Sequence, residues 1–132
     1  FTNIYKNISQ LKKINQKIIS IFGCGGNRDK SKRSLMGKIS EKYSDQIYIT
    51  NDNPRNENED LIINDICSGF SNSKHQIIKN RKNAIEQALL ENKNSIILIL
   101  GKGIEEFQII KNAKIPHSDI RIVKNIINAN RN

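Results

Sequence analysis

Apolar residues along the chain follow two spacings, one typical of helices and one typical of buried strands. In five segments they recur every three or four residues, which is the pattern of an amphipathic helix. These segments lie near residues 3–14, 35–43, 61–70, 84–89 and 122–127. Short continuous apolar runs predict buried strands at residues 17–22, 46–50, 76–79 and 95–100.

The order of these segments predicts an α/β fold. Strands that alternate with helices are typical of a mostly parallel sheet with helices on both faces. Residues 107–110 and 114–115, separated by Lys111-Asn112-Ala113, predict a C-terminal hairpin. Ser118-Asp119 provides an N-cap for a closing helix. We expect one domain over residues 1–132, long enough to bury an aliphatic core.

The chain is basic, with a formal net charge of +9. Its lysines are scattered over predicted helix faces, and its few aromatic residues do not interleave with them as a base-stacking surface requires. We therefore expect no nucleic-acid partner. A basic α/β module that binds another anionic ligand, or nucleic acid, is the alternative that the charge leaves open.

Cysteine and histidine usage favours a reducing compartment and no metal. Cys24 and Cys67 lie far apart without metal-ligand spacing, so two free thiols are expected. His75 and His117 are isolated from acidic or cysteine clusters. No apolar run is long enough for a membrane span, and the N-terminus lacks a signal-peptide core. These features predict a cytoplasmic protein without a membrane partner.

Three unusual loops each follow a predicted strand directly, at residues 23–33, 52–55 and 101–105. The carboxyl ends of parallel strands lie at one edge of a sheet, where ligands of such folds bind. We therefore expect the three loops to form a single site.

The first loop is rich in glycine and in positive charge. Its sequence lacks the third glycine of the dinucleotide fingerprint, because Arg28 stands there, and no Gly-Lys-Ser/Thr closes a phosphate loop. Arg28, Lys30, Lys32 and Arg33 would suit a phosphate or carboxylate. A solvated basic turn is the other interpretation.

The other two loops carry chemistry that suits a zwitterion. Pro54 stiffens the second loop, which presents the amide of Asn53 and the guanidinium of Arg55. Glu105 offers a carboxylate for an ammonium group. The simpler interpretation is a strand-to-helix turn with a solvated Arg55. No Ser-His-Asp or Cys-His set is visible, so we predict no catalytic residue in this chain.

Four motifs resemble those of one enzyme family. Phe22 to Gly37 is similar to "FGCGGDRDKGKRPLMG", and Thr50 to Arg55 to "T(D/S)DNPR". Ile62 to Ile66 matches "IINDI", and Gly101 to Glu105 with Gln108 is similar to "GKGHExYQ". In this order and spacing, the motifs resemble the C-terminal domain of the Mur ligases, of the type that adds meso-diaminopimelate to a peptidoglycan precursor.

The resemblance implies a Rossmann-like, three-layer domain of an ATP-dependent ligase. The N-terminal UDP-substrate domain and the central ATPase domain would lie outside residues 1–132, which alone would be inactive. ATP and Mg²⁺ would be bound mainly by the central domain. The implied partners are meso-diaminopimelate and, through the other domains, UDP-N-acetylmuramoyl-L-alanyl-D-glutamate. A monomer is expected.

The resemblance also implies site residues. Its diaminopimelate-binding positions match Arg28, Asn53, Arg55, Gly101 and Glu105. The segment Asp52-Asn53-Pro54-Arg55 would distinguish diaminopimelate from L-lysine. The chain departs from the family at several positions. Asn27, Ser31 and Ser34 are changes that a loop should tolerate, Ile104 replaces a histidine, and Asp119-Ile120-Arg121 replaces "DRE".

Overall fold

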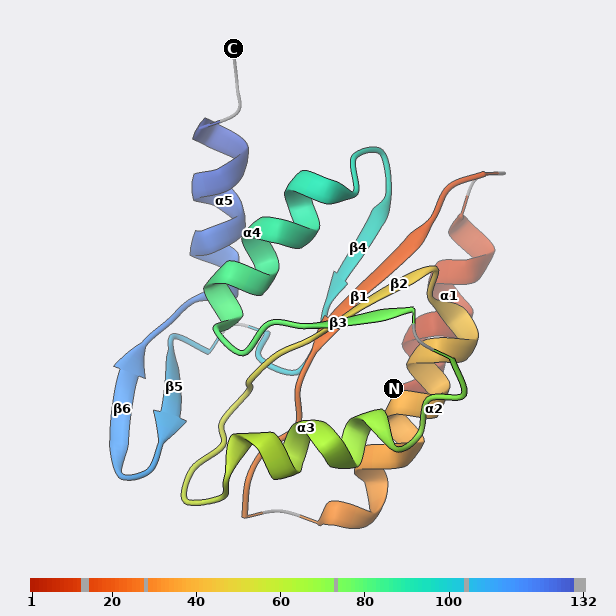
Figure 1. The fold of residues 1–132 in the computed structure, drawn as a ribbon. Coiled ribbons are helices and arrows are strands. Elements are labelled where there is room, and N and C mark those ends of the chain that lie inside the picture. Colours follow the sequence, from red (N-terminus) through yellow and green to blue (C-terminus); the bar gives the residue numbers. More distant parts are fainter. Residues whose placement is uncertain (13–14, 28, 73, 104, 130–132) are drawn as a thin grey trace.

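Four parallel strands form the central sheet of the computed structural model, which describes residues 1–12, 15–27, 29–72, 74–103 and 105–129 (Figure 1). The strands are β1 (Ile18–Phe22), β2 (Gln46–Ile49), β3 (His75–Ile77) and β4 (Ile96–Ile99). They are arranged in the order β3-β2-β1-β4, and each neighbouring pair is parallel. The predicted parallel sheet is confirmed.

Helices cover both faces of this sheet, which gives three layers (Figure 1). One face carries α1 (Thr2–Leu11), α2 (Arg33–Tyr43) and α3 (Glu59–Cys67). The other face carries α4 (Arg81–Glu91) and α5 (Asp119–Ala129). A short 3-10 helix, Lys30–Lys32, precedes α2.

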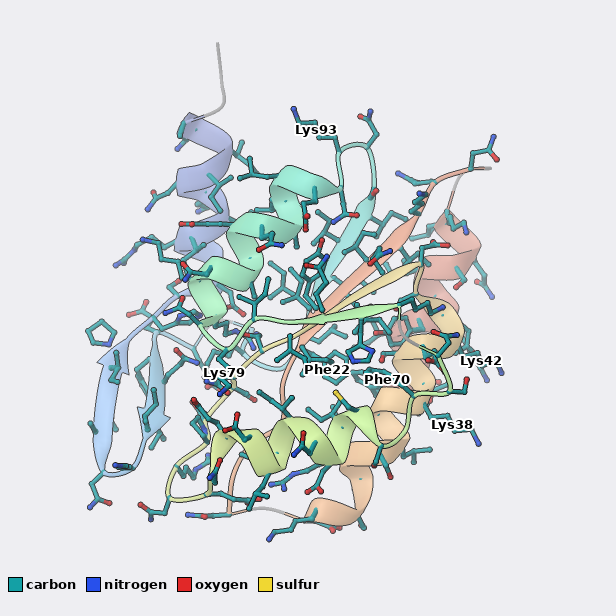
Figure 2. The ribbon with its side chains drawn as sticks, viewed as in Figure 1. Phe22, Lys38, Lys42, Phe70, Lys79 and Lys93 are labelled. Carbon is teal, nitrogen blue, oxygen red and sulfur yellow. The ribbon has the colours of Figure 1, made fainter. Side chains whose placement is uncertain are left out.

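The central strand β1 is buried on both sides because its side chains alternate between the two helical layers. Ile19 and Ile21 pack in one cluster with α4 and α5. Phe22 packs in a second cluster with α3, to which Phe70 also contributes (Figure 2). A strand enclosed in this way is mostly apolar, which explains the apolar run in the sequence; its one polar residue, Ser20, is buried and hydrogen-bonded to Tyr5 and Ser44.

A separate antiparallel hairpin, β5 (Phe107–Ile110) and β6 (Ala113–Pro116), follows β4. It confirms the predicted hairpin, but Ala113 belongs to β6 and the turn contains only Lys111 and Asn112. Lys111 adopts a positive φ of 55°, which lets the chain reverse over two residues.

Other element ends also differ from the predictions, most clearly in the first helix and the third strand. The first helix ends at Leu11, because Lys12 is extended, and Ile14 lies outside the described residues. The third strand begins at His75 and ends at Ile77, where the predicted strand was 76–79. Register with β2 decides this, since His75 pairs with Ile47.

The strand order reverses between β1 and β4. After β1 the chain continues to α2 on one face, and after β4 it continues through the hairpin to α5 on the other. Such a reversal leaves a crevice beyond the strand ends where ligands bind in open α/β sheets. No helix within the described ranges is long and apolar enough to cross a membrane.

Candidate functional site

The glycine-rich loop after β1 and the loop after β2 are in direct backbone contact. Gly26 N donates a hydrogen bond of 2.7 Å to the carbonyl oxygen of Asn53. Arg55 reaches back across the same contact and donates from Nη1 to the carbonyl oxygen of Gly26 at 3.1 Å. The prediction that these two loops meet at one edge of the sheet is confirmed.

The hairpin holds the second loop from the other side. Arg55 N donates to Ile109 O at 3.0 Å, and Lys111 N donates to Arg55 O at 2.6 Å. Arg55 adopts a left-handed backbone with φ of 53°, which costs a non-glycine residue about 1 kcal/mol. The two hydrogen bonds to the hairpin offset that cost and keep the half-buried Arg55 side chain beside the glycine loop.

The third loop is joined to the second by Lys102, whose side chain is fully buried. Lys102 Nζ donates to Asn53 Oδ1 at 2.7 Å and to Phe107 O at 3.2 Å. It also lies 3.0 Å from Asp52 Oδ1 and 3.4 Å from Glu105 Oε1. One ammonium group therefore connects two predicted site loops and the start of β5.

Of the predicted site residues, four lie within this arrangement. Asn53 is buried, Arg55 is half-buried, and Gly101 and Glu105 are exposed. Gly101 has a φ of 106°, and a Cβ built there would lie 3.4 Å from Asp52 Oδ2, so the backbone passes close to the second loop. Arg28 and Ile104 lie outside the described residues.

Arg33, one of the four basic residues of the first loop that would suit a phosphate or carboxylate, is instead paired with acidic residues of the chain itself. Arg33 is 1 % exposed, and its two terminal nitrogens donate to Glu57 at 2.6 and 2.9 Å. It also donates to Asp65 at 2.9 Å and to Gly25 O at 3.0 Å. With both terminal nitrogens committed to these groups, Arg33 holds the glycine loop in place and does not face a ligand.

The same ion pair perturbs Glu57. Hydrogen bonds from Arg33 stabilise the carboxylate and lower the pKa of Glu57 from 4.5 to about 2. Glu57 also accepts a hydrogen bond of 3.2 Å from Asn27 N, and so connects the first loop to the segment after Arg55.

A second buried arginine supports the strand ends. Arg81 donates to both carboxylate oxygens of Asp119, at 2.9 and 2.8 Å, and to the carbonyls of Asn51 and Leu100. Burial raises the pKa of Asp119, but hydrogen bonds from Arg81 and His117 outweigh it, so the net shift is downward. Asp119 of the altered "DRE" motif is thus a scaffold residue, whereas Arg121 is exposed.

Neither Lys102 nor Arg81 stands out in the sequence as a residue with a role of its own. The sequence indicates a special position for Lys102 only weakly, because it lies between two glycines directly after an apolar strand. Nothing in the local sequence distinguishes Arg81 from the surrounding basic residues, since its partners lie up to 38 positions away.

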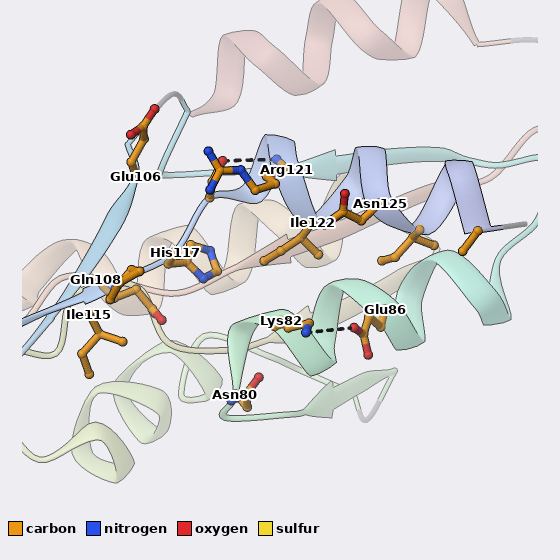
Figure 3. A pocket seen from close by; sticks show the side chains of 14 residues that line it. Asn80, Lys82, Glu86, Glu106, Gln108, Ile115, His117, Arg121, Ile122 and Asn125 are labelled. Carbon is orange, nitrogen blue, oxygen red and sulfur yellow. Dashed lines mark hydrogen bonds and ion pairs between the residues drawn. The ribbon is translucent and has the colours of Figure 1, made fainter.

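A groove of about 700 Å³ lies beside this site, between α4, α5 and the hairpin (Figure 3). The groove is lined by both positively and negatively charged side chains, and Lys82 Nζ lies 3.9 Å from Glu86 Oε1 in an ion pair. None of the predicted site residues that the structure describes lines the groove. Gln108 lines the groove and also donates to the carbonyls of Asn51 and Asp52, so this residue connects the groove to the second loop.

Within the described part of the chain, no three His, Cys, Asp or Glu side chains gather in a way that could hold a metal ion. Lys102 instead holds Asn53 close to the carboxylates of Asp52 and Glu105, and Arg55 lies beside the glycine loop. Donors and carboxylates side by side are able to bind a ligand that carries both carboxylate and ammonium groups.

Known proteins resemble this chain over most of its length. Residues 1–103 match the family model described as "Mur ligase, glutamate ligase domain". A protein of Aquifex aeolicus (strain VF5) named UDP-N-acetylmuramoyl-L-alanyl-D-glutamate--2,6-diaminopimelate ligase is 46% identical over 127 residues, which are 95% of this chain and 26% of that protein. A protein of the same name from Buchnera aphidicola subsp. Baizongia pistaciae (strain Bp) is 51% identical over 133 residues, which cover 96% of this chain and 26% of that protein.

A solved structure titled as a UDP-N-acetylmuramoyl-L-alanyl-D-glutamate--2,6-diaminopimelate ligase has the same fold. It superimposes with a TM-score of 0.88 at 29% sequence identity, and covers 97% of this chain and 26% of that one. The chain thus spans about a quarter of the length of the curated relatives it matches.

Proposed function

The chain belongs to the Mur ligase family, and we propose that it is the C-terminal, amino-acid-binding domain of a ligase that joins meso-diaminopimelate to UDP-N-acetylmuramoyl-L-alanyl-D-glutamate. The observation that carries this proposal is the buried Lys102, whose Nζ lies within 2.7 Å of Asn53 and 3.4 Å of Glu105. Lys102 brings the loop that carries the amide of Asn53 together with the loop that carries the carboxylate of Glu105. The named relatives of this chain act on diaminopimelate. The comparisons do not favour the alternative of a basic module for nucleic acid or another anion.

In this proposal each site residue has a chemical role. The forked guanidinium of Arg55 and the amide of Asn53 bind the distal carboxylate of diaminopimelate. Glu105 and Asp52 attract its distal ammonium group, and Arg28 receives the other carboxylate. Gly101 allows the backbone to approach the ligand. Together they hold the amine in position for attack on an activated carboxylate.

ATP and Mg²⁺ would supply that activation from another part of the ligase. Residues 1–132 contain no Gly-Lys-Ser/Thr phosphate loop, and the described residues offer no cluster for a metal ion. We therefore assign ATP to a central domain and the UDP-linked substrate to an N-terminal domain of the full-length protein. The contribution of this chain is to select and orient the incoming amino acid.

The test is amino-acid selectivity of the full-length protein. Ligase activity is measured with meso-diaminopimelate and with L-lysine, which lacks the distal carboxylate. Arg55→Ala should lower kcat/KM for diaminopimelate at least tenfold, because a charged hydrogen-bond pair is worth about 1.5–3 kcal/mol. L-lysine should be affected much less. Equal use of both amino acids by the unaltered protein would contradict the proposal.

A further inference from the structure

Lys102 occupies an unusual position for a lysine, since its ammonium group is buried where three chain segments meet. The second loop contributes Asp52 and Asn53, the third loop contributes Glu105, and β5 contributes the carbonyl of Phe107. Burial of an unpaired ammonium would be costly, and these acceptors make it tolerable.

The contact with Asn53 fixes which side of that amide remains available. Asn53 Oδ1 accepts from Lys102 Nζ at 2.7 Å and from Ile109 N at 3.0 Å. An ammonium and a backbone N–H can only donate, so the atom that faces them must be the oxygen. The NH₂ group of Asn53 therefore points away from Lys102 and is left to donate.

This orientation has a consequence for recognition. A free amide offers both donor and acceptor and could bind either a carboxylate or an ammonium group. With its oxygen committed twice, Asn53 is a donor only. It matches a carboxylate, as Arg55 does, and it leaves the ammonium of the ligand to Glu105 and Asp52.

We infer that Lys102 is a positioning residue for substrate selectivity: by holding Asn53 Oδ1 it turns the amide NH₂ toward the distal carboxylate of the amino acid. The inference rests on the proposed function, since it assumes that Asn53 contacts the substrate. Lys102 acts through Asn53 and does not itself meet the ligand.

The first test is Lys102→Met in the full-length protein, with kcat and KM measured for meso-diaminopimelate and L-lysine. Methionine keeps an unbranched chain and removes the donor. We expect KM for diaminopimelate to rise about tenfold or more, with a much smaller change for L-lysine. A variant with a lower melting temperature but unchanged selectivity would reduce Lys102 to a structural residue and overturn the inference.

A matched control is Lys93→Met. Lys93 is exposed in the turn before β4, at the end of the sheet opposite the three loops (Figure 2). This substitution removes the same charge far from the site, and both KM values should stay unchanged. If both lysine variants shifted the KM for diaminopimelate equally, overall charge would explain the effect and the inference would fail.

Asn53→Asp tests the amide orientation without removing any contact that supports the fold. One carboxylate oxygen can still accept from Lys102 and Ile109, but the group facing the ligand becomes an acceptor. We expect the melting temperature to be kept and diaminopimelate use to fall at least tenfold through repulsion of like charges. Retained or improved use of diaminopimelate would mean that Asn53 faces an ammonium, which overturns the inference. This variant decides the question even if Lys102→Met does not fold.

A double-mutant cycle separates the two proposals. If Lys102 acts through Asn53, then Lys102→Met should cause no further loss of selectivity in an Asn53→Ala background. Additive losses would contradict that coupling. If Asn53→Ala and Arg55→Ala both leave the selectivity intact, the proposed site itself is wrong. If they abolish it while Lys102→Met does not, only the role of Lys102 is wrong.

Discussion

Gly26 and Pro54 lie so close that no side chain fits between them. A Cβ built on Gly26 would lie 1.8 Å from the carbonyl oxygen of Pro54. This close approach allows Gly26 N to donate to Asn53 O at 2.7 Å. The glycine-rich loop therefore serves to bring the backbone of the second loop close, in addition to any contact it makes with a ligand.

Gly26→Ala should displace the second loop. Forcing a methyl group into a filled space costs about 1–3 kcal/mol, and the backbone at Pro54 must shift to admit it. We expect a lower melting temperature for the chain and, in the full-length protein, a raised KM for diaminopimelate.

The matched control is Gly103→Ala, where a Cβ would meet no heavy atom within 4 Å. Its φ of 54° still makes alanine unfavourable by about 1–2 kcal/mol, so some stability should be lost. Selectivity should stay close to that of the unaltered protein. A larger loss of diaminopimelate use at Gly103 than at Gly26 would contradict the packing argument.

Arg33→Met should destabilise the chain strongly. Removal of one partner from a buried ion pair costs about 3–5 kcal/mol, and here Glu57 and Gly25 O both lose their contacts with the guanidinium. Urea unfolding measures the change in free energy. The same substitution at the exposed Arg121 should stay within about 0.5 kcal/mol, and equal effects at both positions would argue against a structural role for Arg33.

The low pKa of Glu57 predicts loss of stability in acid. Its pKa is about 2 in the folded chain against an ordinary value of 4.5, so protonation favours the unfolded state. The contribution is fully present above pH 4.5 and disappears as the pH falls toward 2. Unfolding free energies measured across this window should decline. In Glu57→Gln the decline should be shallower, and identical slopes would contradict the assignment to Glu57.

Cys24 should be a slowly reacting thiol. Burial raises its pKa to about 11, so little of the reactive thiolate is present near neutral pH. We expect iodoacetamide to modify Cys24 far more slowly in the folded chain than in urea. A Cys67→Ser variant isolates this signal, and fast labelling of the folded variant would show that Cys24 is accessible and ionised.

The α/β fold could be predicted from the sequence because burial imposes its own periodicity. A strand enclosed by helices on both faces, such as β1, is apolar at nearly every position, and the sequence shows this run directly. The predicted ends of strands were less accurate, because a strand ends where its hydrogen-bonded pairing with the neighbouring strand ends. Register with β2, not local composition, determines where β3 begins at His75.

The candidate site was predicted in part. Local sequence identified the second and third loops, because glycine, proline and charged residues after a strand mark a break in the pattern of burial. Local sequence did not distinguish the arginine that supports the fold from the arginine that lies at the candidate site. Arg33 and Arg55 are equally basic in sequence, but Arg33 is buried against Glu57 and Arg55 lies beside the glycine loop.

The sequence by itself determined the succession of strands and helices along the chain, the edge of the sheet where the loops gather, and the resemblance to the Mur ligases. Only the tertiary structure decided that Lys102 lies buried between those loops, with its Nζ 2.7 Å from Asn53 Oδ1. The physical reason is that the two residues are 49 positions apart. Periodicity reports whether a residue is buried, whereas the partner of a buried charge depends on how distant segments pack.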